Sequence, residues 1–318
     1  MDEAYDVVVI GGGAAGLSGA LTLSRARRSV LVVDAGQPRN APAGHVHNYL
    51  GREGTAPAEL YAIGRAEAEG YGATVVDGRV TGVVREDDGF RVELDGGLAV
   101  QARRLLLATG LTDELPELPG VAERWGSTVL HCPYCPYCHG WEVRDRAVGI
   151  VSTGAMGVHA ATMWRQWTDD VVLFVHTGVQ PTADELEQLA ARGVRVVRDE
   201  VAGLEGGADV RLASGELVAR DAVVVTPRFS ANADLVAGLG AVPVPMEMNG
   251  VVVGSHLAAD PTGRTDVPGV WVAGNVGDMS AQVIVAAAQG LKAGAMMNAD
   301  LIEEETAHAV AGKRSVAA

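Results

Sequence analysis

The chain has 318 residues, of which 48% are hydrophobic and 4% aromatic, and this length is enough for two domains with separate cores. Its formal charge of −15 excludes nucleic acids and anionic membranes as partners, because their phosphates would repel it. No apolar run is long enough to span a bilayer, so we expect a cytoplasmic protein with no membrane partner.

The first motif is a glycine-rich turn at residues 11–16, which reads Gly-Gly-Gly-Ala-Ala-Gly. It follows an apolar strand at residues 6–10 and opens a helical pattern, as a dinucleotide-binding turn does. Gly11 would allow the tight turn, Gly13 would let the backbone approach a pyrophosphate, and Gly16 would let helix and strand pack closely. The N–H groups at the start of the helix would bind the phosphates.

A second strand at residues 29–33 ends in Asp34, at the spacing expected for a carboxylate that binds the adenosine ribose. The sequence therefore predicts a dinucleotide site. A Pro- and Gly-rich loop follows at residues 36–51 and contains two histidines and Asn48. Because long ordered loops are often functional, we expect this loop to contribute to the site.

The rest of the chain repeats this order of elements. Expected helices occupy residues 56–70, 155–167, 183–192 and 280–304, and expected strands occupy 104–110, 147–151, 171–175, 221–227 and 267–275. A change of domain is expected after the Pro-rich residues 115–120. The sequence thus predicts an α/β protein with two nested, three-layer, Rossmann-like nucleotide-binding domains.

All three cysteines lie in one stretch at residues 131–140, which reads His-Cys-Pro-Tyr-Cys-Pro-Tyr-Cys-His-Gly. Its last part matches the Cys-x-x-Cys-His pattern of haem attachment, but that attachment needs export and the N-terminus shows no export signal. Zinc needs four ligands and a second cysteine pair is absent, although His131 or His139 could complete a site. A redox-active pair is favoured, provided that a nearby group accepts its electrons.

Together these motifs resemble the low-molecular-weight thioredoxin reductase family of flavoproteins. The resemblance covers the glycine turn with Asp34, the Ala-Thr-Gly strand end at residues 108–110, the Cys-x-x-Cys ahead of a second nucleotide fold, and Pro-Gly-Val-Trp-Val-Ala-Gly-Asn at 268–275. Cys-Pro-Tyr-Cys-His-Gly-Trp-Glu and Pro-Arg-Asn at residues 38–40 make the chain similar to FAD-dependent dithiol oxidases that close disulfides in microbial metabolites, such as gliotoxin and holomycin.

The resemblance implies FAD as the cofactor, a homodimer and a thioredoxin reductase-like division of the chain. Residues 1–117 and 246–318 would form the FAD-binding domain, and residues 118–245 would form an NAD(P)H-binding-like domain that carries the cysteines.

The resemblance also implies which residues contact FAD. The motif glycines and Asp34 would hold its ADP part, Asn48 would lie beside the flavin, and the backbone of Gln282 and Val283 would face the isoalloxazine ring. Asn275 stands where the reductases have Asp and would meet the ribityl or phosphate region. The full expected set is Gly11, Gly13, Ala14, Ala15, Gly16, Asp34, Ala35, Arg39, Asn48, Ala108, Thr109, Gly110, Asn275, Gln282 and Val283.

The cysteine stretch has three residues more than the family pattern. Aligned on its downstream end, Cys138 is the flavin-proximal thiol, Cys135 exchanges with substrate, and Cys132 is an extra thiol. The other frame pairs Cys132 with Cys135. The two prolines suit the first turn of a short helix, where a thiolate would be stabilised, and His139 could act as its general acid–base.

The second glycine turn, at residues 152–157, begins with Ser152 in place of the first glycine. The following strand ends without the arginines that NADPH needs or the carboxylate that NADH needs. We therefore expect a FAD-dependent dithiol oxidase that forms a disulfide in a natural product and passes electrons to O2, which gives H2O2. Two alternatives stay open: an NADPH- or ferredoxin-dependent thioredoxin or disulfide reductase, and a flavin-binding thiol sensor.

Overall fold

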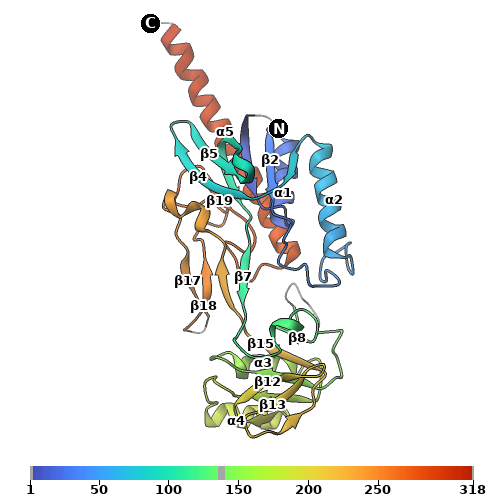
Figure 1. Cartoon of the computed structure of the whole chain (residues 1–318). Coiled ribbons are helices and arrows are strands. Elements are labelled where there is room, and N and C mark those ends of the chain that lie inside the picture. The colour runs from blue at the N-terminus through green and yellow to red at the C-terminus, as the bar shows by residue number, and fades with distance from the viewer. Residues whose placement is uncertain (1–2, 135–139, 249, 317–318) are drawn as a thin grey trace.

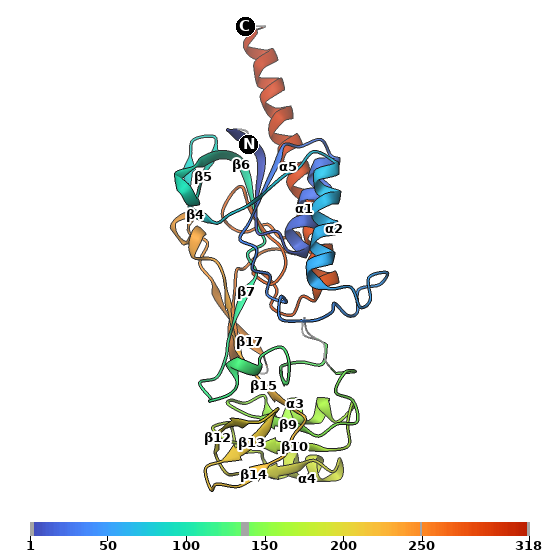
Figure 2. The same cartoon turned by 45° about the vertical axis from the view of Figure 1, so that its right-hand side comes forward.

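The computed structural model describes residues 3–134, 140–248 and 250–316. Two α/β lobes are joined by a narrow four-stranded sheet, and the C-terminal helix projects from the upper lobe (Figures 1 and 2). The predicted α/β class with two Rossmann-like folds is confirmed. Within the described residues, no helix combines the length and the apolarity needed to cross a membrane.

A seven-stranded sheet forms the core of the first lobe. Its strands are β1 (Ala4–Ile10), β2 (Val30–Asp34), β3 (Thr74–Asp77), β4 (Val80–Glu86), β5 (Gly89–Leu94), β6 (Ala99–Leu107) and β19 (Val270–Val272). Their order is β3-β2-β1-β6-β5-β4, with β19 paired to β6. Strands β1, β2, β3, β6 and β19 are parallel, whereas β4 and β5 form an antiparallel meander.

Both faces of this sheet are covered, and its central strands β1, β2 and β6 accordingly contain runs of buried valine and leucine. Helices α1 (Ala14–Arg25), α2 (Pro57–Gly70) and α5 (Val283–Val316) cover the face to which Val7 and Val9 point. The short helix η3 (Asp234–Leu239) and the meander cover the face of Val8 and Ile10. Helices α1 and α5 touch at Gly290, where an added Cβ would lie 2.0 Å from the carbonyl oxygen of Ala15.

The second lobe repeats the arrangement. Its parallel strands are β8 (Val129–Leu130), β9 (Val148–Val151), β10 (Val171–Phe174), β11 (Arg195–Val197) and β15 (Ala222–Val225), in the order β11-β10-β9-β15-β8. This order corresponds to β3-β2-β1-β6-β19 of the first lobe. Helices α3 (Gly157–Trp164) and α4 (Ala183–Ala191) lie on one face, and an antiparallel sheet of β12 (Val201–Glu205), β13 (Asp209–Leu212) and β14 (Leu217–Val218) lies on the other.

The lobes are connected by a sheet with the order β17-β18-β16-β7. Its strands are β7 (Leu111–Glu114), β16 (Arg228–Ala231), β17 (Val244–Met248) and β18 (Val251–His256). The antiparallel pair β7 and β16 carries the chain into the second lobe and back out of it (Figure 1). Two further short helices are η1 (Asp95–Gly97) and η2 (Ala122–Arg124). The exact domain boundaries stay a prediction.

Two helices differ from their expected lengths. Helix α3 spans 157–164 instead of 155–167, because residues 155–156 and 165–167 form turns at its two ends. Helix α5 continues to Val316 instead of ending at Glu304. The helical residues after Glu304 include three alanines and no proline, and the helix passes through Gly312 to end just after Lys313 and Arg314, the basic residues typical of a last turn.

Candidate cofactor and redox site

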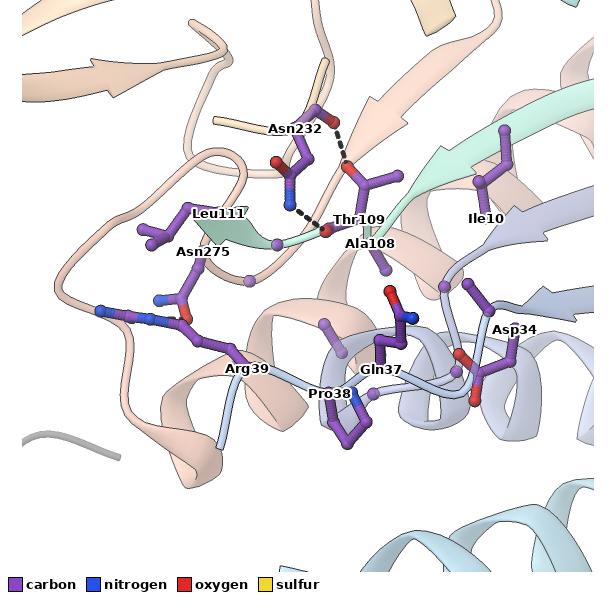
Figure 3. A pocket seen from close by; sticks show the side chains of 18 of the residues that line it. Ile10, Asp34, Gln37, Pro38, Arg39, Ala108, Thr109, Leu111, Asn232 and Asn275 are labelled. Carbon is purple, nitrogen blue, oxygen red and sulfur yellow. Dashed lines mark hydrogen bonds between the residues drawn. The ribbon is translucent and has the colours of Figure 1, made fainter. Parts of the chain in front are cut away.

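A cavity of about 870 Å³ lies at the carboxyl ends of β1, β2, β6 and β19. Figure 3 shows it with Arg39 and Asn275 side by side at one end and Asp34 at the other, which suits an extended ligand. Most of the expected cofactor-binding residues line it: Gly11, Gly13, Ala14, Ala15, Asp34, Ala35, Arg39, Ala108, Thr109, Gly110, Asn275 and Val283. Gly16, Asn48 and Gln282 are not among the residues that line it.

The glycine turn has the geometry that its three positions predict. Gly11 adopts φ +108°, and a Cβ there would lie 2.4 Å from the carbonyl oxygen of Ala108. A Cβ on Gly16 would lie 1.9 Å from the Gly11 oxygen, so helix and strand are in contact at this point. Nothing lies within 4 Å of a Cβ built on Gly13, and α1 begins at the next residue. The first N–H groups of α1 therefore adjoin open space, as phosphate binding requires.

Asp34 ends β2 beside this turn. Its carboxylate lies against Gly12, where a built Cβ would be 2.6 Å away, and its Oδ1 accepts a hydrogen bond from the Gly36 N–H at 3.2 Å. Across the cavity, Thr109 and Asn232 exchange two hydrogen bonds, drawn in Figure 3. These bonds join the end of β6 to the segment that follows β16.

A buried amide at the cavity wall was not predicted from the sequence. Asn40 is 3% exposed and its Oδ1 accepts the Tyr61 hydroxyl at 2.9 Å, but its Nδ2 has no hydrogen-bond partner among the described residues. Burial raises the pKa of Tyr61 to about 12, so this hydroxyl remains a donor. A buried donor without an acceptor costs about 1–3 kcal/mol, and a ligand acceptor in the cavity would remove that cost.

Arg39 forms a two-pronged ion pair with Asp113 of β7, with N–O distances of 2.8 and 2.6 Å. Its third nitrogen donates to Asn275 Oδ1 at 3.1 Å. The amide nitrogen of Asn275 donates to the carbonyl oxygens of Asp278 and Ala281 at 3.0 and 2.9 Å. A carboxylate could not make these last bonds, which explains why a neutral residue occupies this position.

Gln282 lies between two residues that line the cavity, Ala281 and Val283, whereas Asn48 lies eight residues after the last lining residue of its loop, Asn40. Asn48 is exposed and adopts φ +58°, and its N–H donates to Glu53 Oε2 at 2.8 Å inside a loop closed by the pairing of Val46 with Thr55. Gln282 precedes α5, and its carbonyl accepts the Ala286 N–H at 2.8 Å. Their roles as FAD contacts stay predictions.

Within the cysteine stretch, Cys135, Cys138 and His139 lie outside the described residues, so their roles stay predictions. Cys132 is half-buried. A Cβ built on Gly140 would be 2.7 Å from Pro133 Cβ, so the residues that flank the undescribed part lie together.

An aromatic contact and a histidine lie at the upstream end of the stretch. Tyr134 packs edge-on against Trp167 with a centroid distance of 5.1 Å. The Nδ1 of His131 lies 3.1 Å from the Val225 carbonyl oxygen, and burial lowers its pKa. A neutral His131 that donates from Nδ1 to this carbonyl accounts for both observations.

The downstream end of the stretch reaches the first lobe. His47 lies between Glu53 of its own loop and Glu142, with N–O distances of 2.6 and 3.5 Å. The sequence gives no direct signal for this contact, because it joins residues from different lobes.

Comparison with known proteins places this architecture in a family. Residues 5–290 match the model of the pyridine nucleotide-disulphide oxidoreductases. The chain belongs to this family. Its thioredoxin reductase-like members are FAD-binding flavoproteins, so this pyridine nucleotide-disulphide oxidoreductase binds FAD and acts as a flavin-dependent thiol–disulfide oxidoreductase.

Individual relatives agree with this assignment. The chain is 31% identical over 319 residues to thioredoxin reductase tcpT of Claviceps purpurea, which covers 94% of this chain and 95% of that protein. The solved structure of HlmI is 43% identical, with a TM-score of 0.89, and covers 100% of this chain and 99% of that one. An oxidoreductase structure from Agrobacterium tumefaciens is 39% identical, with a TM-score of 0.88, and covers 94% and 99%. The predicted resemblance to the gliotoxin- and holomycin-type flavoproteins is confirmed.

The cavity residues of this oxidoreductase fit FAD. The open space at Gly13 and the start of α1 suit the pyrophosphate, and the Asp34 carboxylate suits the ribose. The Nδ2 of Asn40, which has no partner in the described part of the chain, offers a buried donor. When bound there, FAD supplies a two-electron acceptor for thiols.

Proposed function

We propose that this protein oxidises a small-molecule dithiol of natural-product type to its disulfide, with O2 as the final electron acceptor. The substrate loses two protons and two electrons and gains one S–S bond, and O2 takes up both to become H2O2. Cys135 exchanges with the substrate thiols, Cys138 passes the electron pair toward the cofactor, and His139 takes and returns the proton. Cys132 is an additional thiol upstream of this pair.

The geometry of the second glycine turn is the main support for O2, rather than a nicotinamide, as the partner that exchanges electrons with the flavin. Ser152 is 4% exposed, and its Oγ donates to the Gly154 carbonyl at 2.9 Å. A Cβ on Gly157 would lie 2.4 Å from this Oγ, and one on Gly178 would lie 2.1 Å from it. The hydroxymethyl group thus occupies the space between the turn, α3 and the segment after β10.

The helix behind this turn also starts late. Helix α1 begins at the fourth position of its motif, whereas α3 begins at Gly157, the sixth. The residues between form a turn, and the Gly154 carbonyl accepts a further hydrogen bond from the Val179 N–H at 3.1 Å. The two positions that open the first turn of α1 are therefore not helical here, and the free N–H groups of α3 begin two positions later in the motif. This supports loss of the nicotinamide cofactor.

The second candidate is an NADPH- or ferredoxin-dependent thioredoxin or disulfide reductase. The names of the curated relatives favour it, because tcpT and sirT of Leptosphaeria maculans are called thioredoxin reductases. An aerobic assay with a small dithiol separates the two. The oxidase consumes one O2 and releases one H2O2 for each disulfide formed, without added nucleotide, whereas a reductase forms no disulfide under these conditions.

The cysteine roles are tested by serine substitutions. We expect Cys138→Ser to abolish reduction of the flavin by dithiols, Cys135→Ser to slow it severely, and Cys132→Ser to have a mild effect. Equal damage from Cys132→Ser and Cys135→Ser, with turnover retained in Cys138→Ser, would instead establish the upstream pair. A homodimer and a cytoplasmic location stay predictions that size measurement and fractionation can test.

A further inference from the structure

The Asn40 side chain brings a buried hydrogen-bond donor to the wall of the cofactor cavity. Among the described residues, four buried side-chain atoms have no hydrogen-bond partner, and Nδ2 of Asn40 is the one whose residue lines this cavity. The other three atoms belong to Ser24, His256 and Trp271, which lie elsewhere. Because burial of an amide N–H without an acceptor is unfavourable, we expect a bound ligand to supply the acceptor.

Tyr61 fixes the direction in which this amide faces. Its hydroxyl donates to Asn40 Oδ1 at 2.9 Å. Burial raises the pKa of Tyr61 to about 12, so the phenol keeps its proton at neutral pH and needs an acceptor. A reversed amide would present Nδ2 to the phenol and remove that acceptor. The bond therefore commits Oδ1 to Tyr61 and leaves Nδ2 available to a ligand.

Helix α2 places Tyr61 beside the start of α1. Tyr61, Gly64 and Ala68 are spaced by three and four residues, so they share one face of α2. This face packs on α1, because a Cβ built on Gly64 would lie 3.2 Å from Leu17 Cδ1. One turn earlier on each helix lie Tyr61 and Ala14, and both residues line a neighbouring cavity of about 220 Å³.

The start of α1 is the part of the cofactor cavity that suits a pyrophosphate. Ala14 is the first residue of α1, and nothing lies within 4 Å of a Cβ built on Gly13 before it. Ala14, Tyr61 and Asn40 all line this cavity. Burial is the main cause of the raised pKa of Tyr61, and the Asp34 carboxylate adds to it, so these two side chains are within electrostatic reach of each other. The Asn40 amide is therefore set between the ribose end and the start of α1.

We infer that Asn40 Nδ2 donates a hydrogen bond to the pyrophosphate of bound FAD, and that Tyr61 is a positioning residue that holds the amide for this contact. Phosphate oxygens are ionised acceptors, and hydrogen bonds to them are stronger than bonds to neutral acceptors. Asn40 thereby adds a side-chain donor to the backbone donors of α1. This role concerns cofactor binding alone, so it does not depend on the dithiol and O2 chemistry proposed above.

The test measures the release of FAD from the holoprotein on dilution and its displacement by ADP, with free FAD followed by its fluorescence. ADP carries the ribose and two phosphates but no flavin, so it reports on contacts to that half of the cofactor. The variants are Asn40→Leu, Tyr61→Phe and the double variant. Tyr71→Phe is the matched control, because Tyr71 is an exposed tyrosine at the C-terminal end of the same helix.

Asn40→Leu should weaken the binding of FAD and of ADP by the same factor, about 10- to 100-fold, because a hydrogen bond to a charged group is lost. Tyr61→Phe should weaken both by about threefold, because the amide loses the neutral bond that orients it. The double variant should bind no more weakly than Asn40→Leu, since Tyr61 acts only through Asn40. Tyr71→Phe should match the wild type.

Equal FAD affinity in Asn40→Leu and the wild type would overturn the role of Asn40. Weaker binding of FAD with unchanged binding of ADP would overturn the pyrophosphate contact, and single effects that multiply would overturn the role of Tyr61. If Asn40→Leu does not fold, Asn40→Asp replaces it, because its carboxylate still accepts from Tyr61 but has no donor when ionised. Both ligands should then bind at least about tenfold more weakly at neutral pH, and unchanged binding would again overturn the contact.

Discussion

Replacing Asn275 with Asp tests whether the hydrogen bonds of its amide stabilise this end of the cavity. The Asn275 amide donates to the carbonyl oxygens of Asp278 and Ala281 and accepts from Arg39. An aspartate loses these two bonds, each worth about 0.5–1.5 kcal/mol net, and a longer one to the Met279 carbonyl oxygen, and its carboxylate then faces three carbonyl oxygens. The attraction of the new carboxylate to Arg39 offsets only part of this loss, because Arg39 is already paired with Asp113. We expect a net destabilisation of about 2–4 kcal/mol.

Differential scanning calorimetry of the FAD-loaded protein measures this effect. At about 2 °C per kcal/mol for a chain of this size, Asn275→Asp should lower Tm by about 4–8 °C at neutral pH. The gap should narrow in acid, because a protonated aspartate regains one donor. The matched control Asn232→Asp, whose side chain bonds Thr109 in a more exposed setting, should lose no more than about 2 °C. An Asn275→Asp protein as stable as wild type would refute the reasoning.

Further predictions concern the glycine turn and Glu305 in the second half of α5. Gly16→Ala should destabilise the fold by more than about 1 kcal/mol and lose FAD, because its Cβ would meet the Gly11 oxygen. Gly13→Ala should keep the Tm of the apoprotein and weaken only FAD binding, which equilibrium titration with FAD measures. An equal loss of apoprotein Tm in the Gly13→Ala and Gly16→Ala variants would contradict this. Hydrogen bonds from Arg28 lower the pKa of Glu305 to about 2, so its carboxylate stabilises the fold above its ordinary pKa of 4.5, and this contribution is lost as the pH falls toward 2. Glu305→Gln should therefore have a lower Tm than wild type at neutral pH, and the two Tm values should converge as the pH falls through 2. The difference in the free energy of unfolding at neutral pH should be less than about 1 kcal/mol, because the pair is exposed.

Local patterns made the fold predictable from the sequence. The valine runs and the glycine turn at residues 11–16 each signal their structure within a few residues, and the second lobe repeats the same order. The predicted end of α5 at Glu304 was wrong, because amphipathic periodicity fades after this residue while the backbone continues as a helix. Helix α3 ends early because residues 165–167 form a turn, which the helical pattern of the sequence does not indicate.

Long-range pairs could not be predicted in this way. Arg39 and Asp113 are 74 residues apart, and the ion pair exists only because β7 leaves the first lobe beside the loop after β2. The buried amide of Asn40 likewise depends on Tyr61 of α2. The sequence marked Asn275 as unusual through its neutral side chain, but its reason became clear only from the carbonyl oxygens around it.

The central claim, that electrons enter from a dithiol and leave to O2 without a nicotinamide, is tested most directly by anaerobic stopped-flow mixing. The oxidised holoprotein is mixed with a small dithiol, and in parallel with micromolar NADPH or NADH, while flavin absorbance is followed. We expect rapid bleaching of the flavin by the dithiol, no bleaching by either nucleotide, and recovery with H2O2 release when air is admitted. Rapid bleaching by NADPH or NADH would contradict this claim and establish the reductase.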